Sequence, residues 1–191
     1  GHEQVSGTSL SPEAFIATAR LPEDVRLELV AREPAVVDPV GLAFDADGRM
    51  YVVEMGGYPS RPEASLPMGR VKRLEDLDLD GYFETWTVFA DNLQYPTSVL
   101  PWRDGVLVTQ PPDILWLRDT DDDGVADLRE ALFSGFPVEN TQHNINGLIW
   151  GLDNWVYAAN GGNGGSGYPV GSGSEPVSIR GLDFRFQPST R

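Results

Sequence analysis

Short apolar segments, bounded by turn residues, recur along most of this chain. Three stretches share one order, which is an apolar segment, a tight Asp-Gly or Asp-Asn turn and a second apolar segment, at 39–53, 96–108 and 145–157. This order is typical of a β-hairpin. The first two stretches are each followed by a third and a fourth apolar segment, at 69–74 and 85–89 and at 113–118 and 129–133. The pattern therefore predicts antiparallel sheets of four strands.

Four antiparallel strands repeated every roughly 45–55 residues are typical of the blades of a β-propeller. We expect an all-β fold, a β-propeller with three blades at about 33–92, 93–138 and 139–191, in which residues 179–186 supply the third strand of the last blade. The first strand of each blade would line a central channel. Because propellers close with about four to eight blades, the sequence predicts either part of a longer propeller or a half that a second copy completes as a homodimer.

The N-terminal region is expected to differ from the propeller, which we place at residues 11–191. Residues 1–10 are polar, begin with a tag-like pair and are predicted to be flexible. Ser11 as a cap and Pro12 at the first helical position predict a short helix. Residues 25–30 alternate between apolar and charged side chains, which predicts a half-buried strand that supplies a missing outer strand of its own ring or of a partner's.

One acidic pattern occurs twice, 43 residues apart, directly after the third strands. Carboxylates at alternate positions, a turn-forming glycine and a further carboxylate make a cage of hard oxygen ligands for Ca²⁺. The expected ligands are Asp76, Asp78, Asp80 and Glu84 in the first copy and Asp119, Asp121, Asp123 and Asp127 in the second, with the carbonyl groups of Tyr82 and Val125. Calcium would stabilise the outer hairpins structurally. The alternative is an acidic hairpin turn that binds nothing.

Composition excludes several classes of partner. The formal net charge of −15 and the pI near 4.3 argue against nucleic acid and against an anionic membrane surface. The chain has no cysteine, which excludes disulfides, thiolate nucleophiles and cysteine-ligated metals. No apolar run approaches the roughly 18 residues that a membrane span needs, so we predict no membrane span in this chain.

A cluster of amides surrounds His143, which directly precedes the third hairpin. Loops at this position of a propeller open onto the mouth of the channel. An imidazole there can serve as a base, and the neighbouring amides of Gln142 and Asn144 can orient a substrate. The alternative is that His143 only forms hydrogen bonds between blades. The glycine-rich run at 160–168 is not followed by a helix, so we expect a surface loop and no phosphate site.

Three stretches of the chain, 42–55, 108–115 and 140–148, resemble a bacterial family named for a membrane-bound dehydrogenase domain. The resemblance spans about residues 10–191. That family is in turn similar to the soluble quinoprotein glucose and aldose dehydrogenases, which are six-bladed propellers that bind pyrroloquinoline quinone (PQQ) with Ca²⁺.

The resemblance implies a function. It suggests part of an exported dehydrogenase, periplasmic or extracellular, that oxidises a sugar or an alcohol by hydride transfer to PQQ. His143 would be the catalytic base, and Gln142 and Asn144 would contact substrate or cofactor. The cationic residues that hold the quinone in those enzymes lie largely on later blades and have no match here. The alternative is a non-catalytic propeller that binds carbohydrate or protein, assembled as a dimer of half-propellers.

Overall fold

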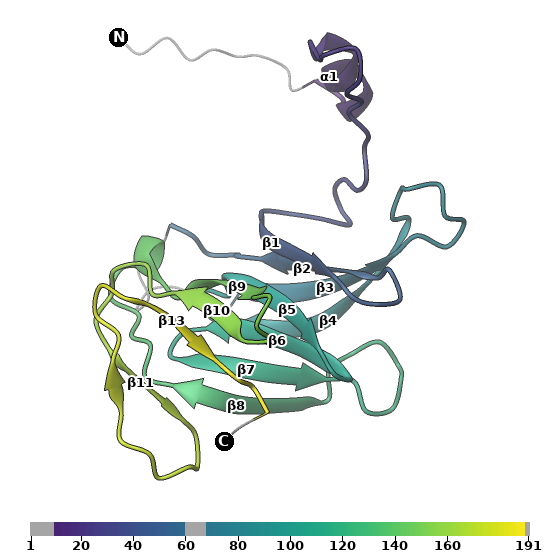
Figure 1. Cartoon of the computed structure of the whole chain (residues 1–191). Helices are drawn as coiled ribbons and strands as arrows, with labels where there is room; N and C mark the ends of the chain where they lie inside the picture. Colours follow the sequence, from purple (N-terminus) through teal and green to yellow (C-terminus); the bar gives the residue numbers. More distant parts are fainter. Residues whose placement is uncertain (1–9, 60–67, 190–191) are drawn as a thin grey trace, which may run out of the picture.

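The structure, a computed structural model, describes residues 10–59 and 68–189 (Figure 1). Nearly all of the expected flexible segment 1–10 lies outside the described residues. One short α-helix, α1 (Pro12–Thr18), precedes the strands. The strands are β1 (Pro39–Phe44), β2 (Met50–Glu54), β3 (Gly69–Glu75), β4 (Thr85–Leu93), β5 (Ser98–Trp102), β6 (Gly105–Gln110), β7 (Asp113–Arg118), β8 (Leu128–Ser134), β9 (Asn146–Trp150), β10 (Val156–Ala159), β11 (Ser166–Pro169), β12 (Val177–Ser178) and β13 (Asp183–Phe186).

All paired strands are antiparallel and form three sheets. The first sheet has the order β1-β2-β3-β4, and the third has the order β13-β10-β9. The second sheet contains β5-β6-β7-β8 and is extended beyond β8 by β11 and β12. This arrangement confirms the all-β prediction. Within the described residues the sheets do not close into a ring, and no helix is long and apolar enough to cross a bilayer.

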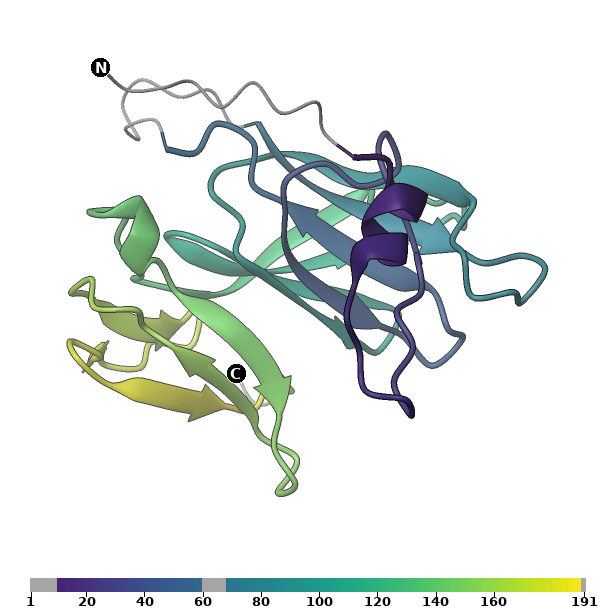
Figure 2. The same ribbon diagram turned by 90° about the horizontal axis from the view of Figure 1, so that it is seen from above.

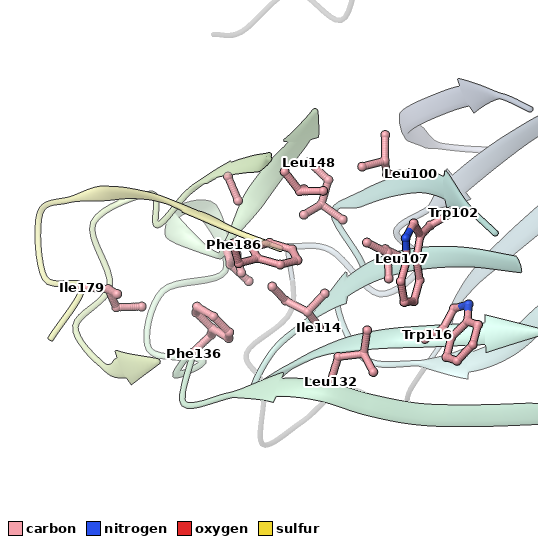
Figure 3. Packing of buried hydrophobic residues seen from close by; sticks show 13 residues of the cluster. Leu100, Trp102, Leu107, Ile114, Trp116, Leu132, Phe136, Leu148, Ile179 and Phe186 are labelled. Atoms are coloured by element: carbon pink, nitrogen blue, oxygen red, sulfur yellow. The ribbon is translucent and has the colours of Figure 1, made fainter. Parts of the chain in front are cut away.

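The sheets stack in chain order, with the second between the first and the third (Figure 2). The core between the first and second sheets includes Val53, Val71, Phe89, Val106 and Leu117. A second core joins the second and third sheets and contains Leu107, Ile114, Leu132, Leu148 and Phe186 (Figure 3). Successive side chains of a strand point to opposite faces, so continuous apolar runs give the second sheet an apolar surface on both sides.

The first strands of the three sheets lie side by side, β1 against β5 and β5 against β9. Their beginnings lie at one end of the stack and their final residues, Phe44, Trp102 and Trp150, at the other. This alignment gives the stack two ends, each lined by equivalent parts of the repeated hairpins.

The helix prediction is confirmed. The Ser11 side chain accepts a hydrogen bond from the backbone N–H of Ala14 at 3.1 Å, and Pro12 opens the helix. The helix stands away from the sheets and has no buried residue (Figure 1). An ion pair of 3.1 Å between Glu13 and Arg32 connects it to the segment before β1.

The strand prediction for residues 25–30 is wrong. These residues have no strand neighbour, and their side chains are largely exposed. Alternation alone cannot form a strand without an edge to pair with. The third strand of the last sheet also begins later than expected, at Asp183, because the turn before it needs a positive φ of 68° at Gly181.

The glycine-rich run is not purely a loop. It ends in β11, which pairs with β8 through Tyr168 opposite Ser134. The hairpin of β11 and β12 therefore extends the second sheet, although the expected blade boundary near residue 138 placed it with the third.

A buried ion pair fastens the segment before β1 onto the outer face of the first sheet. Lys72 and Glu54 are each 2% exposed, and their Nζ and Oε1 atoms lie 2.9 Å apart. Lys72 also donates to the carbonyl oxygens of Pro34 and Ala35 at 2.9 and 3.0 Å. Glu54 accepts the backbone N–H of Val37 at 2.7 Å. The pair thus satisfies backbone groups that cover the sheet without belonging to it.

Replacing Glu54 by leucine should leave Lys72 as a buried cation without its carboxylate. We expect the free energy of unfolding to fall by about 3–5 kcal/mol, measured by urea denaturation followed by circular dichroism. The double variant Glu54→Leu/Lys72→Met removes both buried charges and should recover part of that loss, because the carbonyl oxygens of Pro34 and Ala35 and the N–H of Val37 still lose their partners. Equal losses in the two variants would contradict this account.

Candidate functional site

The two acidic loops, residues 76–84 and 119–127, fold alike. In each, the first aspartate, Asp76 or Asp119, accepts the N–H of the loop glycine at 2.8 Å. The next backbone N–H in each loop donates to the last carboxylate. Leu77 donates to Glu84 at 2.9 Å, and Thr120 donates to Asp127 at 3.0 Å. The glycines have φ values of 94° and 91°, which favour glycine. The sequence repeat is therefore also a repeat of conformation.

Six of the eight expected calcium ligands are brought together. In two groups, one carboxylate oxygen from each member lies within 4.8 Å of the others; the groups are Asp76, Asp78 and Glu84, and Asp119, Asp121 and Asp123. Asp80 and Asp127 lie outside these groups. Their carboxylates accept hydrogen bonds within the loops, and that of Asp127 has a lowered pKa, chiefly because the Thr120 side chain donates to it. Clustered carboxylates repel one another, and hard oxygen ligands suit Ca²⁺.

The surroundings of the two loops differ. In the second loop, the N–H of Ala126 donates to the carbonyl oxygen of Phe89 on β4, at 2.7 Å. At the equivalent place in the first loop, the N–H of Phe83 donates to the carbonyl oxygen of Val30, at 2.8 Å. The segment at Val30 thus stands where β4 stands one repeat later. Residues 25–30 are no strand, but the chain at Val30 occupies the place of an outer strand of a preceding sheet.

A polar pocket of about 600 Å³ lies at the beginnings of β1 and β9 and just before β5. We call it the polar pocket. Its polar lining residues are Asp38, Tyr58, Thr97, Thr141, Gln142, Asn144 and Asn146. Among the described residues that line it, none is a lysine or an arginine. The pocket therefore offers neutral hydrogen-bonding groups and one carboxylate, with no cation to bind an anionic group.

Gln142 and Asn144 both line the polar pocket, as a binding role requires, but His143 between them does not. Gln142 Nε2 donates to the Tyr58 hydroxyl at 2.8 Å, which joins the loop after β2 to the turn before β9. His143 is exposed, and its ring lies beside the glycine-rich loop. A β-carbon at Gly162 would stand 3.4 Å from its Nδ1 atom.

Two buried asparagines of the glycine-rich run hold the turn that carries these residues. Asn163 donates to the carbonyl oxygens of Pro137 and Asn140 and to Asn144 Oδ1, each at 3.2 Å. Asn160 donates to the carbonyl oxygen of Ile179 at 2.8 Å. The glycine-rich run is thus the support of the pocket wall rather than a free loop.

A cavity of about 590 Å³ lies at the opposite ends of the same strands, near Phe44, Trp102 and Trp150. Most of its charged side chains are already paired. Arg49 contacts Asp45 at 2.7 Å, for example, and Arg73 lies 3.7 Å from Asp119 of the second acidic loop. Because so many of its polar groups are engaged within the protein, we take the polar pocket as the candidate ligand site.

Sequence reasoning missed Asp38, Tyr58, Thr97, Asn146 and Asn163. One signal was available. When the three hairpins are aligned, Val40, Thr97 and Asn146 fall at the same position, and all three line the polar pocket. Tyr58 and Asn163 had no such signal, because they reach the site through long-range contacts.

The family model for DUF7133, a domain of unknown function, matches residues 11–191. The chain belongs to this family. In comparisons with curated proteins and with solved structures, nothing matches the chain. The DUF7133 description states no activity.

Asn163 should matter to this DUF7133 domain as a support of the pocket wall. Asn163→Ala removes the hydrogen bonds to Pro137, Asn140 and Asn144 and leaves the buried Asn144 side chain without its partner, and we expect the free energy of unfolding to fall by about 2–3 kcal/mol. Asn92→Gly, an exposed change that tolerates the positive φ of 54° at that position, is the control. The measurement is denaturant unfolding of both variants. Equally small decreases in the free energy of unfolding for the two variants would contradict the supporting role of Asn163.

Proposed function

We propose that this chain forms three blades of a β-propeller and that the polar pocket is part of its ligand site. Support comes from the repeated hairpins, the stacking of consecutive antiparallel sheets and the side-by-side placement of β1, β5 and β9. The beginnings of these strands would surround one mouth of the channel. At that mouth, each of the three repeats contributes one equivalent residue to the lining of the pocket, namely Val40, Thr97 and Asn146.

The ligand that this pocket suits best is a neutral molecule rich in hydroxyl groups, such as a sugar or a polyol. The observation that carries this proposal is the composition of the lining, which combines amides, hydroxyls and the single carboxylate of Asp38 with the apolar residues Pro39, Val40 and Met55. Hydroxyl groups both donate and accept, so they can pair with amide oxygens, amide N–H groups and a carboxylate alike. An anionic ligand would meet Asp38 with no lining cation to offset it.

PQQ does not fit the lining as described. It carries three carboxylates, which would need arginine or lysine side chains, and the described pocket offers none. We therefore derive no chemical step through the quinone from these residues.

Dehydrogenase activity is the second candidate. One observation favours it beyond the family resemblance. The His143 ring is exposed beside the pocket wall, and no described residue forms a hydrogen bond with it. An imidazole in this state is available as a proton acceptor. In this candidate, Gln142 and Asn144 would hold the alcohol and His143 would be the base, and the hydride would pass to an acceptor that the described pocket lining does not hold.

Calcium would be a structural component in either case. We propose that each acidic loop binds one Ca²⁺ and that the metal offsets repulsion among the clustered carboxylates. Extracellular calcium modules work at about 10⁻⁴–10⁻³ M, so a periplasmic or extracellular location, which we also propose, would supply the ion.

Binding of neutral hydroxylated probes tests the main proposal. D-Glucose, myo-inositol and glycerol, titrated calorimetrically, should include at least one ligand, and Asp38→Asn should weaken its binding about tenfold by removing the acceptor carboxylate. Asp183→Asn, exposed on β13, should leave binding unchanged. Absence of binding by all three probes, or equal binding by Asp38→Asn, would overturn the proposal.

The same samples, supplied with PQQ, Ca²⁺ and a redox dye, separate the two candidates. Dye reduction by the wild type that His143→Ala abolishes would favour the dehydrogenase. Binding without dye reduction would favour the binding module.

Calcium should raise the thermal stability of the domain. We expect 5 mM Ca²⁺ to raise Tm by about 3–8 °C relative to chelator. Asp78→Asn and Asp121→Asn should each reduce this shift, because they remove a carboxylate from the two groups. Asp122→Asn, an acidic loop residue outside the groups, should keep the full shift. A shift that is absent, or that all three variants share, would contradict metal binding at the loops.

A further inference from the structure

We infer that Asn144 selects the ligand of the polar pocket by donating its side-chain N–H to an acceptor oxygen of the ligand. The inference rests on the proposed function, because it takes the polar pocket as the binding site. It names the group that recognises the ligand and the kind of atom that the ligand must present there.

The orientation of the Asn163 amide is fixed by backbone groups. Its Oδ1 atom accepts the N–H of Asn140 at 3.2 Å, and its Nδ2 atom donates to the carbonyl oxygens of Pro137 and Asn140. A backbone N–H can only donate and a backbone carbonyl can only accept. The amide of Asn163 therefore cannot be reversed, and it is the Nδ2 atom that reaches Asn144.

The orientation of Asn144 follows from that of Asn163. The Asn144 atom 3.2 Å from this Nδ2 atom is Oδ1, because an amide N–H group faces an oxygen and not another N–H group. The oxygen of Asn144 is thereby used inside the protein. Its own Nδ2 atom is buried and has no partner among the described residues. Asn144 as a whole is 2% exposed, and it lines the polar pocket. A buried amide N–H without a partner is unfavourable, and Asn144 lines the polar pocket, so a ligand oxygen that enters beside Asn144 would supply the missing acceptor.

The other groups of the pocket complete the recognition. Gln142 uses its N–H on the Tyr58 oxygen, which leaves the Gln142 Oε1 atom as an acceptor and the phenolic hydroxyl as a donor. Asp38 supplies a carboxylate. A suitable ligand places an ether, carbonyl or hydroxyl oxygen at Asn144 and hydroxyl donors at Asp38 and Gln142. Sugars and polyols meet this requirement, and a ligand that presents only donors does not.

Asn144→Asp tests the inference directly. The aspartate keeps one oxygen as the acceptor for Asn163 but presents a second acceptor where the wild type presents a donor. At pH 7.5 we expect at least tenfold weaker binding of the sugar or polyol probe. Burial favours the neutral form of this carboxyl. At pH 4.5 we therefore expect its O–H to replace the lost donor and binding to recover toward the wild-type value at that pH.

Gln142→Glu is the matched control. It adds the same charge to the same pocket and keeps the contact with Tyr58, whose hydroxyl can donate to the new carboxylate. Asp38, Tyr58 and His143 are the other ionisable residues near the pocket, so wild type is measured at both pH values. A larger recovery in acid for Asn144→Asp than for Gln142→Glu supports the inference. Binding by Asn144→Asp at pH 7.5 as tight as that of wild type would overturn it.

A second measurement separates this inference from the proposed function. The Asn144 side-chain amide signal in a ¹⁵N–¹H spectrum of wild type should shift with the sugar or polyol probe and with dimethyl sulfoxide, which can only accept a hydrogen bond. If the hydroxylated probes do not bind but dimethyl sulfoxide shifts the signal, the proposed function fails and the Asn144 donor stands. If hydroxylated probes bind and the signal does not move, the inference fails and the proposed function stands. No shift with any probe overturns the inference.

Discussion

The second sheet of this protein is apolar on both faces, and this constraint determines how the rest of the chain is arranged. Val106 and Leu117 face the first sheet, whereas Leu107 and Ile114 face the third. Such a sheet cannot leave either face in water without a large loss of hydrophobic stabilisation. Stacking against a sheet on each side satisfies both faces, and the repeated hairpins of the sequence provide these sheets.

The first sheet meets the same constraint with a different solution. Its outer face is covered in part by residues 31–36, which are not a strand, together with Phe83 from the first acidic loop. Covering a sheet with irregular chain leaves backbone carbonyl groups without partners. Lys72 satisfies the carbonyl oxygens of Pro34 and Ala35. The equivalent position in the second sheet is Leu115, which packs against the core between the first two sheets.

The sequence predicted those elements whose information is local. The hairpins, the helix cap at Ser11 and the two acidic loops each depend on residues a few positions apart, and the structure contains them where the sequence indicated. The strand expected at 25–30 depends on an edge elsewhere in the fold, which no local pattern reveals. The pairing of β11 with β8 is also long-range, and a run of glycines concealed it.

The same difference between local and long-range information applies to the candidate site. Gln142 and Asn144 could be chosen from the sequence because they precede a repeated hairpin. What makes Asn144 informative is a chain of contacts from Asn140 through Asn163, and the orientation of each amide follows from the one before it. These contacts fix which atom of Asn144 is left for a ligand. The sequence alone does not show whether that atom is the amide oxygen or the amide nitrogen. The chemistry of the site is therefore set by the glycine-rich run, whose conformation brings Asn163 back to the turn before β9.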